Sequence, residues 1–220
     1  MRTITYCTFF LAAPLLAQSA DRVKIDNDQV RVLKVVSKPG DKSGTHEHNM
    51  NRVMVYLDAG RMTLTGADGK VEPLQWKAGT VLWSPAPGQH VSTNTFEKPY
   101  QIVEIELKGT PQPARFPALD PVKVDPQRYK VEFENNEVRV VRARYGPREK
   151  GVTHEHALNR VVTFLTDQNM KITTPDGKAN EGHARAGDVQ WGGPAKHLEE
   201  NLSDQPMEVV VVEFKTGGQR

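Results

Sequence analysis

The stretch THEHNMNRV at residues 45–53 recurs as THEHALNRV at residues 153–161. Aligned on these copies, the halves of the chain match without a gap from 30–57 to 138–165, at an offset of 108 residues. After Trp83 and Trp191 the offset becomes 107, and it holds to Glu106 and Glu213. The chain is therefore predicted to consist of two copies of one unit, each long enough to bury its own core.

Each copy contains short apolar segments bounded by Gly, Pro or Asp. In the first copy they are 30–35, 53–57, 81–83 and 102–107, and in the second they are 138–141, 161–165, 189–191 and 209–214. Asp-Gly pairs at 68–69 and 176–177 favour tight hairpin turns. Many short, evenly spaced strands with almost no helix predict an all-β fold, with an antiparallel barrel or jelly roll in each half.

The predicted boundaries follow from the duplication and from composition. Residues 1–19 combine one early arginine, an apolar stretch and Ala17-Gln18-Ser19, which is typical of a secretory signal peptide. Residues 20–110 and 128–216 are the expected N-terminal and C-terminal barrels. Between them, residues 111–127 are rich in proline and predict an extended linker.

The composition excludes several classes of function. The single cysteine, Cys7, lies in the predicted leader, so the processed chain has no thiolate ligand, cysteine nucleophile or disulfide. Loss of Arg2 with the leader changes the formal charge from +2 to +1, and no Lys/Arg run suggests a nucleic-acid partner. No later segment is long and apolar enough to span a bilayer. We expect a soluble protein that is periplasmic or secreted.

Six of the seven histidines belong to the duplication. They form the sets His46, His48 and His90, and His154, His156 and His197. Imidazoles two residues apart on a strand point to the same side, and a third can come from another strand. This pattern predicts a three-histidine metal site in each half, for Fe, Zn, Mn or Cu. The alternative is that these are polar strand residues that hold no metal.

These motifs resemble the cupin superfamily, specifically a bicupin. The residues that match are Gly40, His46, His48, Gly60, Gly79, Pro85, Gly88, His90 and Asn94, and in the second half Gly187, Pro194, His197 and Asn201. Gly88 is displaced by one place, the second half lacks one residue, and Arg148 replaces its leading glycine. The resemblance implies two tandem double-stranded β-helix barrels, with a metal inside each barrel mouth.

One departure from the cupin pattern affects the chemistry. The family's glutamate ligand follows the second histidine by four or five residues, where this chain has Arg52-Val53 and Arg160-Val161. Glu47 and Glu155 cannot easily substitute, because strand alternation points them away from the histidines. Three neutral imidazoles leave the charge of a divalent ion uncompensated, so an anionic ligand is favoured.

Arg52 and Arg160 are the predicted catalytic residues, because a guanidinium near the metal could bind a substrate carboxylate in bidentate fashion. In the alternative, each arginine pairs with an acid on a neighbouring strand and only stabilises the barrel. Core packing is the favoured role for Trp83 and Trp191 over stacking on a ligand. The remaining candidates are Asn94 and Asn201, expected to bond loop backbone, and His183, expected in an exposed loop.

The first functional hypothesis is a metal-dependent enzyme that acts on a small carboxylated or enolisable organic molecule, with dioxygenase chemistry as the first guess. The alternatives are a zinc-dependent lyase or hydrolase, and a non-enzymatic protein that binds a sugar acid or similar anion. The sequence offers no His, Lys or Glu, shared by the two copies, that could serve as a general base in the expected pocket. If only one half is catalytic, the first half is expected to be active because it is closer to the cupin motif. Whether the chain forms a homodimer stays open.

Overall fold

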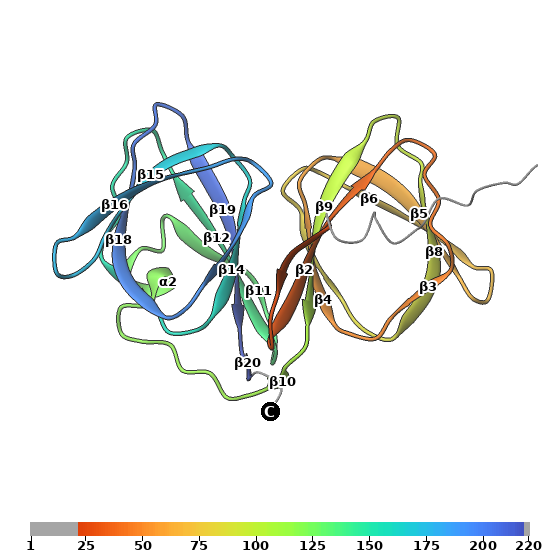
Figure 1. The fold of residues 1–220 in the computed structure, drawn as a ribbon, viewed down its shortest axis with the longest axis horizontal. Helices are drawn as coiled ribbons and strands as arrows, with labels where there is room; N and C mark the ends of the chain where they lie inside the picture. The colour runs from red at the N-terminus through yellow and green to blue at the C-terminus, as the bar shows by residue number, and fades with distance from the viewer. Residues whose placement is uncertain (1–21, 218–220) are drawn as a thin grey trace, which may run out of the picture.

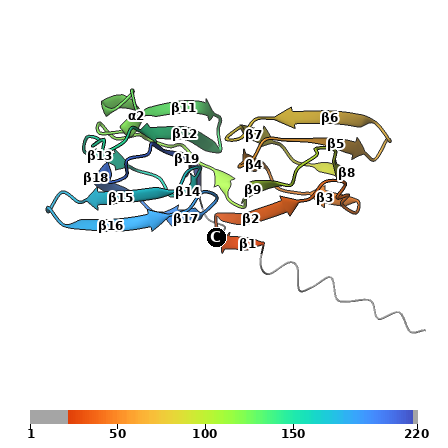
Figure 2. The same cartoon turned by 90° about the horizontal axis from the view of Figure 1, so that it is seen from above.

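The computed structural model describes residues 22–217, so the predicted signal peptide at 1–19 lies outside the described residues. The described part is nearly all β, as predicted, and its strands form two groups of sheets side by side (Figures 1 and 2). Within residues 22–217, no helix is both long and apolar enough to cross a membrane.

The N-terminal half pairs a five-stranded sheet, in the order β1-β2-β9-β4-β7, with a four-stranded sheet, in the order β3-β8-β5-β6. Its strands are β1 (Val23–Asp26), β2 (Val30–Ser37), β3 (His46–His48), β4 (Arg52–Tyr56), β5 (Gly60–Gly66), β6 (Val71–Trp76), β7 (Val81–Ser84), β8 (Gly88–Asn94) and β9 (Tyr100–Leu107). A buried cluster that includes Tyr56, Met62 and Trp76 joins the two sheets.

The C-terminal half repeats this arrangement, with sheet orders β11-β12-β19-β14-β17 and β13-β18-β15-β16. Its strands are β11 (Tyr129–Glu134), β12 (Val138–Tyr145), β13 (His154–His156), β14 (Arg160–Phe164), β15 (Gln168–Thr173), β16 (Ala179–Ala184), β17 (Val189–Gly192), β18 (Ala195–Asn201) and β19 (Met207–Phe214). Between the halves, β10 (Thr110–Pro111) pairs with β20 (Thr216–Gly217), and the helix α2 (Pro121–Val124) lies in the predicted linker segment.

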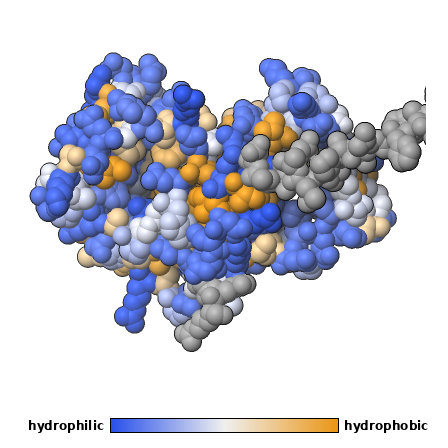
Figure 3. All heavy atoms as spheres, viewed as in Figure 1, coloured by the Kyte–Doolittle hydropathy of each residue, from blue (hydrophilic) through white to orange (hydrophobic). Residues whose placement is uncertain are grey.

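The two five-stranded sheets share one apolar core. Val30 and Val32 of β2 belong to the same buried cluster as Val210 and Val212 of β19. The central strands β9 and β19 bury residues on both faces, which explains why 102–107 and 209–214 are mostly apolar. The face seen in Figure 3 is mostly hydrophilic, with apolar surface gathered near the boundary between the halves. Trp83 and Trp191 pack against the shared core, as predicted.

Polar contacts across this boundary are repeated in a swapped sense. Asn51 donates to Glu137, and Asn159, its counterpart, donates to Gln29, the counterpart of Glu137. Such reciprocity is the mark of a two-fold interface, here formed between two copies within one chain.

The loops confirm most of the local predictions. Gly69 and Gly177 have φ of 79° and 83° in the hairpin turns β5–β6 and β15–β16. Asn201 donates to the loop carbonyl of Gly146 at 2.9 Å, and Asn94 donates at 3.2 Å to the carbonyl of Ser37, the last residue of β2. His183 is exposed as expected, but it lies on β16 rather than in a loop, because β16 completes the hairpin with β15.

Candidate metal centres

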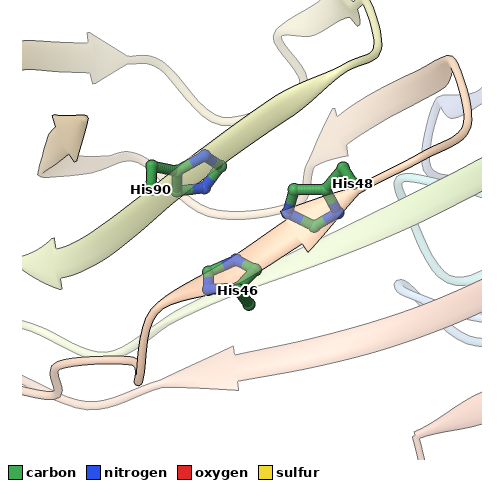
Figure 4. A group of neighbouring side chains, drawn as sticks. All are labelled: His46, His48 and His90. Carbon is green, nitrogen blue, oxygen red and sulfur yellow. The ribbon is translucent and has the colours of Figure 1, made fainter. Parts of the chain in front are cut away.

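The N-terminal histidines come from two neighbouring strands. His46 and His48 lie on β3, and antiparallel pairing places His90 of β8 opposite His46. The ring centroid of His46 lies 4.7 Å from that of His48 and 4.7 Å from that of His90. One nitrogen from each ring lies within 4.8 Å of the others (Figure 4). The predicted first triad is therefore brought together.

The C-terminal triad has the same construction with deeper burial. His154 and His156 lie on β13, and His197 of β18 pairs with His154. Their ligating nitrogens also lie within 4.8 Å of one another. All three of these histidines are buried, whereas the N-terminal three are only partly buried.

Hydrogen bonds fix the orientation of the rings. Nδ1 of His46 lies 2.9 Å from the Gly44 carbonyl, and Nδ1 of His154 lies 3.0 Å from the Val152 carbonyl. Because a carbonyl only accepts, these Nδ1 atoms carry the hydrogen and leave Nε2 free to coordinate. Nδ1 of His156 lies 3.0 Å from the Glu213 carboxylate, which is the kind of support typical of metal-binding histidines. The donor sets therefore fit a divalent transition ion.

The imidazoles are in the form that a metal requires. Burial lowers the pKa of His154 to about 4. Burial, helped by the positive charge of Arg52, lowers the pKa of His48 to about 3. Burial also lowers the pKa of His90 and of His156. These four rings are neutral near pH 7, so an ion does not have to displace protons from imidazolium.

Behind His156, a buried network holds Glu213 in place. Arg139 donates to Glu213 at 2.6 Å and to Asp120 at 2.6 Å. The corresponding pair in the N-terminal half is looser, because Arg31 lies 3.9 Å from Glu106 and its side chain is 40% exposed.

The C-terminal triad has an acidic neighbour that the sequence analysis missed. Glu199 follows His197 by two residues on β18, so both side chains lie on one face. Its carboxylate is 3.2 Å from Nε2 of His197 and accepts a 2.6 Å hydrogen bond from the Tyr129 hydroxyl. The Tyr129 and Tyr145 hydroxyls are 2.8 Å apart. The spacing of His197 and Glu199 was the available signal.

These contacts keep Glu199 charged. Burial alone would raise the pKa of Glu199, but the hydrogen bond to His197 and the neighbouring imidazoles hold it well below its ordinary value. Burial and the Glu199 carboxylate raise the pKa of Tyr129, which stays a neutral hydrogen-bond donor. Glu199 is thus an ionised carboxylate present in the C-terminal half alone, because its counterpart in the N-terminal half is Ser92.

A cavity of about 100 Å³ opens beside this cluster. Its polar lining includes His156, Arg160, His197 and Glu199, and its apolar lining includes Val162, Phe164, Met170 and Ile172. Arg160 donates to the Gly193 carbonyl. Among residues 22–217, no carboxylate lies within 4.0 Å of the Arg160 guanidinium.

In Arg52, the counterpart of Arg160, both terminal nitrogens are engaged, while Nε has no hydrogen-bond partner in the described part of the chain. One terminal nitrogen forms a buried ion pair with Glu104 of β9, and the other donates to the Ser84 hydroxyl at 2.9 Å. Arg52 thus has the acidic partner on a neighbouring strand that the alternative interpretation expected. Glu104 was missed as well, although it shares a face with Glu106 in an otherwise apolar strand.

Comparisons with known proteins identify the fold. No family model and no curated protein match the chain. Among solved structures, AerE from Microcystis aeruginosa has a TM-score of 0.62 at 12% identity, covering 84% of this chain and 87% of its own. A variant of Bacillus subtilis oxalate decarboxylase has a TM-score of 0.58 at 14% identity, covering 86% and 69%. Another structure of that enzyme, described by its Mn(II) centres, scores 0.57 at 12% identity, covering 87% and 70%.

These structural neighbours are cupin-family proteins, and at such low identity the likeness shows the fold alone. The chain thus has a cupin-like fold with two histidine groups that could hold a divalent metal ion.

Proposed function

We propose that this chain is a metal-dependent cupin enzyme that binds a small organic acid in its C-terminal half and removes a proton from a carbon atom of that acid. The observation that carries the proposal is Glu199, a partly buried carboxylate between His197 and Tyr129 that lines the same cavity as Arg160. The C-terminal half is thus the favoured catalytic half, in place of the N-terminal half favoured from sequence.

The cavity suits a small molecule with one charged end. The guanidinium of Arg160 would bind a carboxylate through two parallel hydrogen bonds. Phe164, Met170 and Ile172 would hold the remaining carbon atoms by burying apolar surface. A volume of about 100 Å³ favours a short acid over a sugar or a large aromatic compound.

Glu199 is the group that would accept the proton. Its Oε2 accepts from Tyr129, so the carboxylate is held in one orientation, while Oε1 faces His197. A divalent ion on the three imidazoles would polarise an oxygen of the bound acid and make a neighbouring C–H more acidic. This arrangement favours the lyase alternative.

A three-histidine dioxygenase is the second candidate. It is favoured by the two compact donor groups that contain three histidines and no carboxylate. A dioxygenase consumes oxygen in each turnover, whereas proton transfer does not, so oxygen dependence separates the two functions.

The test uses residues 20–220, loaded in turn with Mn²⁺, Fe²⁺ and Zn²⁺. Short 2-oxo and 2-hydroxy acids are incubated with the protein in D₂O with and without oxygen, and NMR follows exchange of the carbon-bound hydrogens. We expect metal-dependent exchange without oxygen, and its loss in Glu199→Gln. Turnover that requires oxygen would establish the dioxygenase instead. Tight binding of an acid without bound metal, exchange or turnover would establish the binding protein.

Metal content provides a separate check on the sites. We expect two ions per chain by elemental analysis, and one after His154→Ala/His156→Ala or after His46→Ala/His48→Ala. Unchanged metal content in either double variant would contradict the assignment of that triad.

We also propose that the chain is an exported bicupin with one jelly-roll barrel in each half. The support is the leader-like composition of residues 1–19 and the identical sheet order of the two halves. Mass spectrometry of the protein from a periplasmic fraction should give Ala20 as the first residue. A chain that retains Met1 and stays in the cytoplasm would contradict export.

A further inference from the structure

The two halves differ in what the arginine beside each histidine triad contacts. We propose that the Glu104 carboxylate occupies, in the N-terminal half, the place that a substrate carboxylate takes in the C-terminal half, so that the chain itself closes the N-terminal site to anions. The inference rests on the proposed function, because it takes the C-terminal site to bind an organic acid.

Glu104 lies between the arginine and the histidines. It projects from β9 into the N-terminal half and is 7% exposed. Its Oε1 accepts from Arg52 and lies 3.6 Å from Nδ1 of His48. A carboxylate that bridges a guanidinium and the edge of a metal site is the arrangement expected for a bound organic acid.

The C-terminal half lacks both side-chain partners of this arginine. In the β4–β9 ladder Met54 pairs with Glu104, and in the β14–β19 ladder Val162 pairs with Val211. Val211 is therefore the counterpart of Glu104.

The same holds for the hydroxyl partner. Arg52 pairs with Ser84, whereas Arg160 pairs with Gly192. A Cβ atom at Gly192 would lie 3.1 Å from Cζ of Arg160, so the missing side chain gives the guanidinium room to lie across the strand. Two pairs of equivalent positions, 84/192 and 104/211, therefore decide whether the arginine has side-chain partners, as Arg52 does, or lacks them, as Arg160 does.

Arg160 has a reason to bind an external anion. It is 8% exposed, and its guanidinium donates to the neutral Gly193 carbonyl. The Glu199 and Glu213 carboxylates attract this cation from a distance, but neither contacts it, so its loss of solvation is only partly offset. Glu199 does not fill this role, because His197 and Tyr129 hold its oxygens.

Glu104 therefore indicates how the substrate binds. Its counterpart ligand would be a carboxylate on the guanidinium of Arg160, beside His156, whose Nδ1 is already held by Glu213. The rest of that molecule would extend along Phe164 and Met170 in the cavity. The predicted substrate is a short aliphatic carboxylic acid, and one such anion should bind per chain.

The test exchanges the two positions between the halves. Isothermal titration calorimetry of the zinc-loaded protein with sodium pyruvate measures anions bound per chain. We expect one for the natural chain, two for Glu104→Val/Ser84→Gly, and none for Val211→Glu/Gly192→Ser. Glu104→Gln is the matched control, because it fills the same space and still accepts from Arg52, so one anion is expected. Glu104→Ala alone is a second variant that should also bind two.

Elemental analysis confirms two zinc ions in each variant before titration. Two anions on the natural chain, or one on both Glu104→Val/Ser84→Gly and Glu104→Ala, would overturn the inference. No anion on the natural chain but one on these variants would support the role of Glu104 and contradict the proposed function. No binding to any of the proteins would overturn both.

Discussion

The N-terminal and C-terminal halves share a sheet order and a histidine triad, yet they surround the triad with different chemistry. Near His48, Glu104 neutralises the arginine by direct contact. Near His197, Glu199 and Tyr129 form a hydrogen-bonded pair, and the arginine is left facing a cavity. The histidine triad is therefore the same in the two copies, whereas the side chains around it differ. The ability to bind a metal does not by itself make a half catalytic.

The supporting shell differs in the same direction. Glu213 contacts His156 at 3.0 Å and accepts a hydrogen bond from Arg139. Its counterpart Glu106 forms no hydrogen bond with His48 and lies 3.9 Å from Arg31. Carboxylates that orient a ligating histidine strengthen metal binding and fix the site geometry. The C-terminal half thus has the more tightly held histidine triad, as the proposed proton transfer over a short distance requires.

The largest expected difference between the two halves is the effect of replacing Glu199. Glu199→Gln keeps the shape and the hydrogen bond from Tyr129 but removes the proton acceptor. Turnover, or hydrogen exchange into the substrate, should fall about 100- to 10,000-fold, while the metal content stays at two ions. Ser92→Ala, at the same position in the N-terminal half, is the matched control and should change the rate less than about twofold. Equal losses in both variants would remove the distinction between the halves.

The second test compares the two supporting arginines. Arg139→Met leaves Glu213 and Asp120 buried without a cation, so the free energy of unfolding should fall by about 3–5 kcal/mol. Arg31→Met removes a half-exposed side chain 3.9 Å from Glu106 and should cost about 0–1 kcal/mol. Urea denaturation of the metal-free variants measures both. A cost as large for Arg31 as for Arg139 would show that the N-terminal shell is equally tight.

The third test uses pH on the metal-free protein. His154 has a folded pKa of about 4 against an ordinary 6.5, so between these values only the unfolded chain takes up the proton. The free energy of unfolding should therefore be unaffected by His154 above pH 6.5, fall as the pH drops toward 4, and lose about 3 kcal/mol in total from this residue. His154→Gln should remove that loss. An unchanged pH dependence in the variant would contradict a buried neutral imidazole.

Much of this structure could be predicted from the sequence because the two copies share short motifs with a regular spacing. Two histidines at a spacing of two, with a third on the paired strand, required only strand alternation, and the Asp-Gly pairs specified their own turns. The helix α2 was missed, although Asp120 followed by Pro121 is an N-cap signature, and the Asp120 side chain does accept from Val122.

The contacts that distinguish the halves depend on register across sheets. Glu104 reaches Arg52 only because β9 pairs with β4, and these strands are far apart in the chain. Tyr129 precedes the aligned region, so the comparison of the two copies gave it no counterpart. Glu199 has Ser92 as its counterpart, so a comparison that looks for residues shared by the two copies does not identify it. The internal repeat therefore revealed the metal ligands, while the residues proposed for catalysis lie where the repeat fails.

The smallest expected effect concerns another position at which the two copies differ, in the loop before β3 and the loop before β13. Gly40 has φ of 79°, and its counterpart Arg148 has φ of 54°, a left-handed conformation that costs a non-glycine residue about 1 kcal/mol. Arg148 is paired with Asp204 at the surface, which offsets little of this cost. Arg148→Gly should therefore raise the free energy of unfolding by about 0.5–1 kcal/mol, and Gly40→Ala should lower it by about 1 kcal/mol. Thermal or urea unfolding of both variants decides the point, and a loss of stability in Arg148→Gly would mean that the ion pair outweighs the backbone strain.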